Sequence, residues 1–312
     1  MNKLVSIIIP AFNEAENIPV ICTEIVSIFK DLPYNYELII VADGCTDNTL
    51  EVINQLAITN THILFIEFSR NFGHQLALKA GLDHASGECA ISLDCDMQHP
   101  PELIPKLLEK WEEGYEVVYT IRKEDKKLPL TKRITSKLFY KILNSLSNVE
   151  LETGTADFRL LDKKVVLVIR NFMETEPFLR GLFKWVGFKQ YSIKYAATER
   201  FHGKSKYNAD KMIRFALEGV TSFSVKPLYG AIYLGFLFSV LSLIYIPYVL
   251  YAIHTGKGVS GWASTIMTIV FFGGLQLIIL GIIGIYIGKM FIQSKHRPNY
   301  IIRSTNIQKT TV

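Results

Sequence analysis

Two long stretches without a charged residue constrain this chain more than any other feature of its sequence. They cover residues 227–253 and 262–288 of 312. Each exceeds the ~20 apolar residues that a membrane-spanning helix needs, and proline and glycine are tolerated inside such helices. A helix of this length without a polar face is unusual in the core of a soluble protein. The sequence therefore predicts two transmembrane helices behind a soluble part, residues 1–226.

The placement of lysine and arginine predicts how this pair is oriented. Lys226 precedes the first stretch, and four cations follow the second: Lys289, Lys295, Arg297 and Arg303. The connector, residues 254–261, contains Lys257 as its only Lys or Arg. Because cytoplasmic segments carry the excess of these residues, we expect both termini in the cytoplasm and a multi-pass protein of the inner membrane.

The soluble part shows no sign of secretion or of nucleic-acid binding. Residues 4–12 form a short apolar run followed by Asn13 and Glu14, which suits a strand and not a signal peptide. The cysteines lack the spacing of metal ligands, and we expect reduced cytosolic thiols at Cys22, Cys45, Cys89 and Cys95. The net charge of +5 is modest. Its clustering beside the predicted membrane helices favours the bilayer, and not nucleic acid, as a partner.

Short apolar runs alternate with helical stretches through the first 125 residues. Strands are predicted at 5–9, 37–41, 63–68, 89–93 and 116–121. This alternation predicts an α/β fold, a mostly parallel Rossmann-like sheet with helices on both faces. Ligands of such sheets bind outside the carboxyl ends of the strands.

Polar clusters follow four of these strands at that end. They are Asn13 with Glu14, Asp43, Arg70 with Asn71, and Asp94 with Asp96. A single acid at a strand end is often a helix cap, so each cluster alone allows a purely structural interpretation. Four together favour a binding site. The glycine fingerprints of dinucleotide and P-loop sites are missing from the sequence, so a bound nucleotide would need a metal at its diphosphate.

Asp94 and Asp96 are the candidate ligands of that metal. Residues i and i+2 of a strand point to the same side, so both carboxylates can converge past the strand end. Mg²⁺ commonly binds one or two carboxylates together with substrate phosphates. A solvated turn or a cap is the competing interpretation of the same triplet.

Two basic amphipathic stretches lie between this part and the membrane. Residues 126–148 and 206–224 set apolar side chains at helical spacing against lysines and arginines. Such helices lie at a membrane interface, with their apolar face buried at the headgroup boundary. The alternative is a core-packing helix with a solvated basic face.

Two further groups are candidates for the acceptor side of a reaction. Asp157 is a single acid in a small-residue and apolar strand, and Arg159, two residues on, could be its ion-pair partner. Residues 200–207 place basic side chains around a glycine just before the membrane, which suits an anion pocket at the height of lipid phosphates. A simple charge cluster attracted to anionic lipid competes with this interpretation.

These segments resemble a known family. Residues 9–14, 42–47, 69–73, 93–98, 156–160, 200–207, 222–224 and 297–301 are similar to motifs of family-2 glycosyltransferases with the GT-A fold. Within that family the chain resembles the polyprenyl-phosphate sugar transferases, above all bactoprenol glucosyltransferases and more distantly dolichol-phosphate mannose synthases. The resemblance covers almost the whole chain.

The resemblance implies roles for particular residues. The donor nucleotide would contact Pro10, Asn13, Glu14, Asp43, Arg70 and Asp94. Asp94 and Asp96 would hold Mg²⁺ or Mn²⁺ on the donor diphosphate, with Asp96 and Asp157 as catalytic residues and Asp157 as the base candidate. Arg200, Ser205 and Lys206 would bind phosphate. The chain departs from the family where Ala42 and Cys45 replace the usual Asp and Ser, which puts the reading of the nucleotide base in doubt.

The implied reaction moves a hexose, with inversion, from a nucleotide diphosphate sugar to a polyprenyl phosphate at the inner membrane face. The closest resemblance favours UDP-glucose; N-acetylglucosamine, galactose and a GDP-mannose donor stay open. We expect a nucleotide-sugar core at 1–125, an acceptor side at 126–226, a membrane hairpin at 227–292 and a tail at 293–312, in a homo-oligomer. A processive polysaccharide synthase and a non-catalytic scaffold are the rival interpretations.

Overall fold

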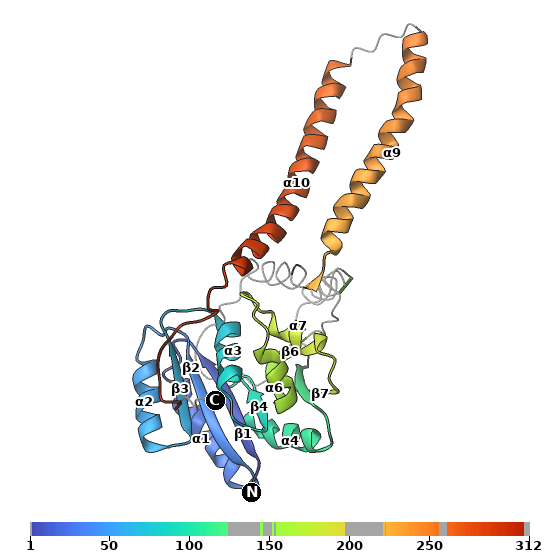
Figure 1. Cartoon of the computed structure of the whole chain (residues 1–312). Coiled ribbons are helices and arrows are strands. Elements are labelled where there is room, and N and C mark those ends of the chain that lie inside the picture. Colours follow the sequence, from blue (N-terminus) through green and yellow to red (C-terminus); the bar gives the residue numbers. More distant parts are fainter. Residues whose placement is uncertain are drawn as a thin grey trace.

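An eight-stranded sheet forms the centre of the described chain. The computed structural model describes residues 2–123, 144–145, 152, 154–196, 221, 223–255 and 261–308. The strand order is β7-β5-β6-β4-β1-β2-β3-β8 (Figure 1). The strands are β1 (Leu4–Ala11), β2 (Asn35–Ala42), β3 (Ile63–Phe68), β4 (Cys89–Ser92), β5 (Val117–Arg122), β6 (Thr155–Asp162), β7 (Gln190–Tyr195) and β8 (Ile302–Thr305).

The sheet is mostly parallel, as predicted. The pairs β1–β2, β2–β3, β1–β4 and β5–β7 are parallel. The pairs β4–β6, β5–β6 and β3–β8 are antiparallel. The five strands expected in the first 125 residues are all present. β6 and β8 enter the sheet from later parts of the chain and run against their neighbours.

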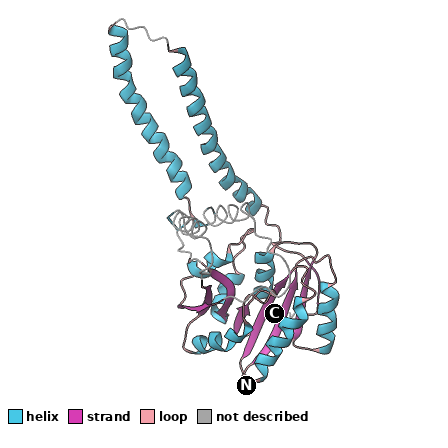
Figure 2. Ribbon diagram, turned by 180° about the vertical axis from the view of Figure 1, so that it is seen from behind, coloured by secondary structure: helices cyan, strands magenta, loops and turns pink. Residues whose placement is uncertain are grey.

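Helices cover both faces of the sheet (Figure 2). One face packs on α1 (Asn17–Lys30), α2 (Thr49–Thr59) and α4 (Ile104–Glu112), which follows the 3₁₀ turn η1 (Pro101–Leu103). The other face packs on α3 (His74–His84), α6 (Lys163–Arg170) and α7 (Leu179–Trp185). Central strands are therefore buried on both sides, which explains why β1 and β2 read as continuous apolar runs and not as alternating ones.

Both uncharged stretches form long helices, α9 (Lys226–His254) and α10 (Trp262–Ser294). Figures 1 and 2 show them leaving the same end of the α/β domain. Within the part of the chain that the structure describes, one helical segment, Phe271–Ser294, has the length and apolarity to cross a membrane, with a mean hydropathy of 2.1. The crossing of a membrane by two helices stays a prediction.

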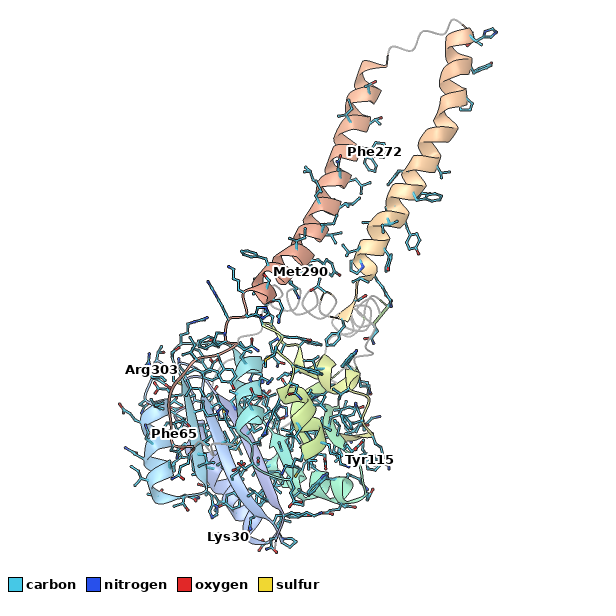
Figure 3. The ribbon with its side chains drawn as sticks, in the orientation of Figure 1. Lys30, Phe65, Tyr115, Phe272, Met290 and Arg303 are labelled. Carbon is cyan, nitrogen blue, oxygen red and sulfur yellow. The ribbon has the colours of Figure 1, made fainter. Side chains whose placement is uncertain are left out.

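The C-terminal tail belongs to the sheet. After α10 the chain returns along the domain, and β8 adds to the free edge of β3. Figure 3 labels Arg303 on this segment and Phe65 on β3. The sequence did not indicate this strand.

Candidate active site

The site lies where the carboxyl ends of β1, β2 and β4 meet. Because these strands are parallel neighbours, their ends emerge at one edge of the sheet. β6 is antiparallel to β4, with Ser92 opposite Arg159, so the beginning of β6 reaches the same edge. The Ser92 hydroxyl donates to the carbonyl of Asp157 at 2.5 Å. Topology thus brings Asp157 to Asp94 across 63 residues of sequence (157 − 94).

Two histidines join these acids into one charged cluster. The Nε2 atom of His74, the first residue of α3, lies 3.5 Å from Asp94 Oδ1 and 3.4 Å from Asp157 Oδ2. His99 Nε2 lies 3.1 Å from Asp94 Oδ2, and its Nδ1 lies 2.6 Å from the Tyr195 hydroxyl. Asp94 is therefore held between two imidazoles.

These contacts set the charge states at the centre of the site. Desolvation lowers the pKa of His74, but Asp94 and Asp157 outweigh it and raise the pKa to about 9. Desolvation raises the pKa of Asp94, yet His74 and His99 lower it below its usual value. At neutral pH the cluster therefore pairs an imidazolium with an ionised carboxylate.

Asp157 is held by an arginine from α7. Arg180 donates from Nε and Nη2 to the two carboxylate oxygens of Asp157, both at 2.8 Å. Burial raises the pKa of Asp157, but Arg180 and His74 hold it well below its usual range. The side chain is 4% exposed. It is an ionised, bidentately bound carboxylate.

The expected partner, Arg159, has a lesser part in this arrangement. Its Nη2 lies 3.6 Å from Asp157 Oδ1, while the same atom donates to the carbonyl of Ala156 at 2.7 Å. The residues do share a side of β6, as the sequence indicated. The bidentate partner comes instead from Arg180, a helix and a loop further along the chain.

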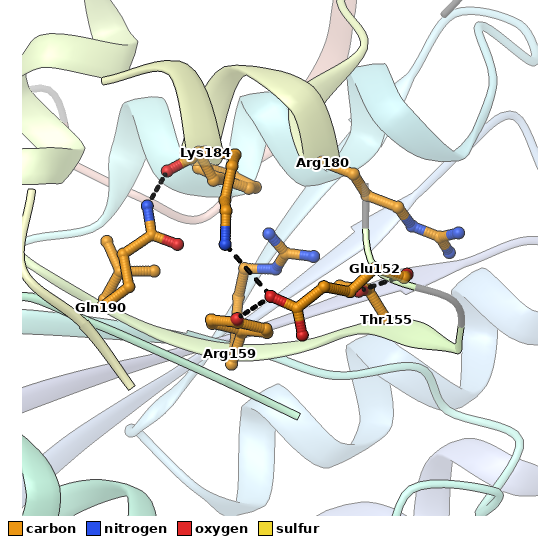
Figure 4. A pocket seen from close by; sticks show the side chains of 9 residues that line it. Glu152, Thr155, Arg159, Arg180, Lys184 and Gln190 are labelled. Atoms are coloured by element: carbon orange, nitrogen blue, oxygen red, sulfur yellow. Dashed lines mark hydrogen bonds and ion pairs between the residues drawn. The ribbon is translucent and has the colours of Figure 1, made fainter. Parts of the chain in front are cut away.

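A small cavity, which Arg159 and Arg180 help to line, lies under α7 (Figure 4). Glu152 accepts from the Tyr119 hydroxyl at 2.6 Å and from Lys184 Nζ at 3.2 Å. The Nε atom of buried Arg159 has no hydrogen-bond partner among the described residues. The cavity volume of about 20 Å³ suits one water molecule and not a ligand.

Three of the expected donor residues, Asn13, Glu14 and Asp43, lie on the loops that follow β1 and β2. Asn13, with φ of 56°, accepts from Thr46 N at 2.8 Å and donates from Nδ2 to Thr46 Oγ1 at 3.0 Å. Glu14 N donates to Thr49 Oγ1 at 2.9 Å. These bonds join the two loops into one wall. Pro10, in β1, contacts the segment after β4 by accepting from Cys95 Sγ at 3.6 Å.

Asp43 connects this wall to the loop after β3. Its carboxylate accepts from Phe72 N at 2.7 Å and Gly73 N at 2.9 Å, at the start of α3. Burial raises the pKa of Asp43, and these two N–H groups oppose the shift. The carboxylate therefore fixes the turn that leads into α3; it does not cap the helix, whose N-cap residue is Gly73. Arg70, on the same loop, is exposed, and its guanidinium lies 4.0 Å from the centre of the Phe72 ring.

Asp96 follows Asp94 in the segment after β4. It is 9% exposed, and its Oδ1 accepts from Gln98 N at 3.1 Å. Met97 has φ of 60°, an unusual backbone conformation for a residue that is not glycine. Among the described residues no group of three or more His, Cys, Asp or Glu side chains is arranged to hold a metal. Two carboxylates with substrate phosphates are nevertheless a common way to bind Mg²⁺, and the oxygen donors of Asp94 and Asp96 fit such a hard cation.

The expected phosphate-binding residues Arg200, Ser205 and Lys206 lie outside the described residues. So do most of the two amphipathic stretches, 126–148 and 206–224. Conversely, the structure brings His74, His99 and Arg180 into the site, which the sequence did not single out. Two signals were available: His74 comes just after the polar end of β3, and His99 follows the two aspartates closely.

Known proteins are similar to this chain in sequence. The family model for glycosyl transferase family 2 matches residues 6–169. The uncharacterized glycosyltransferase YkcC of Bacillus subtilis (strain 168) is 40% identical over 96% of this chain and 93% of its own length. The bactoprenol glucosyl transferase of Shigella phage SfV is 40% identical over 96% of this chain and 98% of its own.

A solved structure shows a weaker likeness. The mannosyltransferase PcManGT of Pyrobaculum calidifontis, in complex with GDP-Man and Mn²⁺, aligns with a TM-score of 0.49 at 17% identity, over 71% of this chain and 64% of that one. That likeness is too remote to bear on the reaction. The family model and the two relatives, which extend over nearly the full length, show that the chain belongs to glycosyl transferase family 2.

Proposed function

We propose that the protein is an inverting glycosyltransferase that moves a hexose, glucose from UDP-glucose in the first instance, onto undecaprenyl or another polyprenyl phosphate at the cytoplasmic membrane face. One observation carries the proposal: the identity with a bactoprenol glucosyl transferase spans 96% of this chain, the charged site and both long helices included. The product would be a lipid-linked sugar donor for modification of a cell-envelope glycan.

The leaving group would be handled by the acids after β4. Asp94 and Asp96 would hold Mg²⁺ or Mn²⁺, which when bound neutralises charge on the departing diphosphate. His74 and His99 fix the Asp94 carboxylate from two sides. Asn13, Glu14 and Asp43 would contact the nucleotide from the joined loops. Ala42 and Cys45, which replace the usual family residues, lie beside Asp43.

Asp157 would orient groups and not remove a proton. Its two carboxylate oxygens are engaged by Arg180 and its pKa is depressed, so it is a weak base. A phosphate monoester, with a second pKa near ~6, is already largely dianionic at pH 7. An acceptor phosphate oxygen therefore needs no base to attack the anomeric carbon. The cationic Arg180 and His74 offset the repulsion between that dianion and the aspartates.

The arrangement of the domain suits an acceptor that stays in the bilayer. The N-terminus lies at the end of the domain far from α9 and α10, so β1 runs toward these helices (Figure 1). The carboxyl ends of the parallel strands, and with them the site, face the side from which α9 and α10 extend. A membrane anchor at that side would hold the site near lipid headgroups and reduce the search for the acceptor to a plane.

The test is a panel of labelled nucleotide sugars incubated with membranes that contain the protein and undecaprenyl phosphate. We expect label in the lipid fraction from UDP-glucose, in a reaction stopped by EDTA, restored by Mg²⁺ or Mn²⁺ and abolished by Asp96→Ala. Labelling from UDP-N-acetylglucosamine, UDP-galactose or GDP-mannose instead would replace UDP-glucose as the proposed donor. Equal results for wild type and Asp96→Ala would refute the catalytic proposal and favour a scaffold.

A further inference from the structure

The segment after α10 is built into the edge of the sheet next to the donor loop, residues 69–73. β8 pairs antiparallel with β3, with Thr305 opposite Ile66 and Ile302 opposite Phe68. The Tyr300 ring stacks on the buried Phe68 ring, with centroids 5.1 Å apart. The Tyr300 hydroxyl donates to Asp83 on α3 at 2.9 Å. The tail therefore contacts both elements that flank the donor loop, β3 and α3.

An irregularity in this pairing directs one arginine at the donor loop. The register shifts between Glu67 and Phe68, which leaves Arg303 between the paired residues Ile302 and Ser304. Such bulges redirect side chains and are frequent beside active sites. Arg303 Nη2 donates to the carbonyl of Ser69 at 3.0 Å, and Nη1 lies 3.3 Å from Glu67 Oε1.

Both backbone polar groups of Ser69 are thus held by the tail. Besides the bond from Arg303 to its carbonyl, Ser69 N donates to the carbonyl of Ile301 at 2.9 Å. Ser69 is the first residue after β3 and begins the donor loop. The tail therefore fixes the position from which this loop departs.

The donor loop in turn positions the residues expected to contact the nucleotide. Asp43 accepts from the N–H groups of Phe72 and Gly73. Gly44, with φ of 63°, packs so closely on the loop that an added Cβ would lie 2.2 Å from the carbonyl carbon of Arg70. A shift of the donor loop must therefore displace Asp43 and Gly44 as well.

We propose that residues 300–306 are a positioning element of the donor site, which raises its affinity for the nucleotide sugar by holding the donor loop through Ser69. The inference rests on the proposed function, since that assigns Asp43 and Arg70 to the donor. A tail that only stabilised the domain would act equally through every bond along β8. A positioning tail acts through the Arg303 end, beside the loop.

A matched pair of substitutions in the full-length protein separates these two roles. Arg303→Ala removes the side-chain bonds to Ser69 and Glu67. Asn306→Ala also removes two side-chain bonds to β3, but at its far end: Asn306 accepts from Phe65 N at 2.7 Å and donates to the carbonyl of Ile63 at 3.1 Å. The measurements are the KM for the nucleotide sugar, kcat, the melting temperature, and hydrogen exchange of the donor-loop amides.

We expect Arg303→Ala to raise the KM about three- to tenfold, because a change of that size corresponds to the loss of about one to two hydrogen bonds. The kcat should stay within about twofold of the wild-type value. Exchange in the donor loop should accelerate, and Arg303→Lys should recover part of the affinity. Asn306→Ala should lower the melting temperature at least as much and leave the KM unchanged.

Equal changes of KM in the two variants would refute the positioning role, and so would an unchanged loop exchange in Arg303→Ala. Hydrogen exchange needs neither sugar nor lipid, so this result is independent of the proposed function. If the wild type binds no nucleotide sugar, the proposed function is refuted. If Arg303→Ala still accelerates exchange in the donor loop in that case, the tail is shown to fix the loop.

Discussion

The buried carboxylate of Asp157 is compensated mainly by a single side chain. Arg180 makes two charge-assisted hydrogen bonds to it, while His74 and Arg159 lie further away, at 3.4 and 3.6 Å. Removal of one partner from such a pair leaves a buried charge whose desolvation is no longer offset. The wild-type arrangement therefore depends on Arg180 more than on the other two.

Substitution of Arg180 by alanine should lower both stability and activity. We expect a loss of about 1–3 kcal/mol in the free energy of unfolding at neutral pH, because His74 and Arg159 remain. The folded-state pKa of Asp157 is depressed, so its stabilisation is present above the unfolded value of about 3.9 and is lost as the pH falls through the folded value. In chemical unfolding, the difference in the free energy of unfolding between wild type and variant should accordingly shrink below about pH 4. A difference that is constant from pH 7 to pH 3 would contradict this.

Gly44 and Gly114 form a matched pair for testing the close approach of two loops. Both have positive φ, 63° and 87°, but an added Cβ meets the Arg70 backbone at 2.2 Å in one case and nothing within 4 Å in the other. Gly114→Ala should cost about 1–2 kcal/mol from backbone strain alone and leave the donor KM unchanged. Gly44→Ala should cost more and raise the donor KM at least tenfold. Similar KM values for both variants would show that loop contact does not shape the donor site.

Single residues also show how far the sequence could predict the site. Asp94 and Asp96 could be found because they form one of four polar clusters at strand ends, and Asp157 because a single acid is uncommon in a small-residue and apolar strand. Arg180 could not, because it lies on a helix whose placement depends on tertiary packing. For His74 the only signal was its position just after the polar end of β3. Strand parity put Arg159 on the side of Asp157 but could not show that its Nη2 donates to the carbonyl of Ala156.

At the level of elements, α3 is fixed on the sheet by close packing and carries His74 into the site. An added Cβ on Gly81 would lie 2.2 Å from Ile8 Cγ2, so the helix lies directly on β1. His74 is two turns away on the same helix. An outward shift of α3 would therefore move the imidazole away from Asp94 and Asp157.

Gly81→Ala should destabilise the protein by about 1–3 kcal/mol through overpacking and should lower the transfer rate. Ile8→Ala removes the obstructing Cγ2. The double variant should therefore lose less stability than the sum of the two, by about 0.5–3 kcal/mol. Ile25→Ala, buried on the opposite face of the sheet, is the control, and its combination with Gly81→Ala should be additive within about 0.5 kcal/mol. Equal coupling in both pairs would refute the contact.

The elements themselves were predictable to different degrees. β1 to β5 are apolar runs bounded by polar clusters, and their positions agree with the sequence to within two residues. β8 has four residues of which three are exposed, so it lacks the apolar pattern that marks a strand. It forms because β3 offers a free edge, which only the assembled sheet provides.

In the whole molecule, α10 is hydrogen-bonded both to the segment just before α9 and to the α/β domain. The Tyr286 hydroxyl on α10 donates to the carbonyl of Ser224, just before α9, at 2.6 Å. Gln293, near the end of α10, accepts from Thr175 N at 3.0 Å and donates to the carbonyl of Met173 at 2.7 Å. The start of α9 therefore lies close to the C-terminal half of α10. A short linker can connect these two points in place of the chain between them.

This closeness allows membrane anchoring to be separated from donor binding. In one variant a glycine–serine linker replaces residues 227–286 and the tail is kept; in the other the chain ends at Pro227, which also removes β8. We expect the linker variant to bind the nucleotide sugar like the wild type but to glycosylate long-chain lipid phosphate in membranes at least tenfold more slowly, because it no longer shares the plane of its acceptor. The truncated variant should lose both donor binding and transfer, because the bonds from the tail to Ser69 are gone.

Isothermal titration with the nucleotide sugar measures donor binding, and transfer of labelled sugar to undecaprenyl phosphate measures activity in the membrane. Full transfer by the linker variant would refute the anchoring role, and donor binding by the truncated variant as tight as that of the wild type would count against the positioning tail.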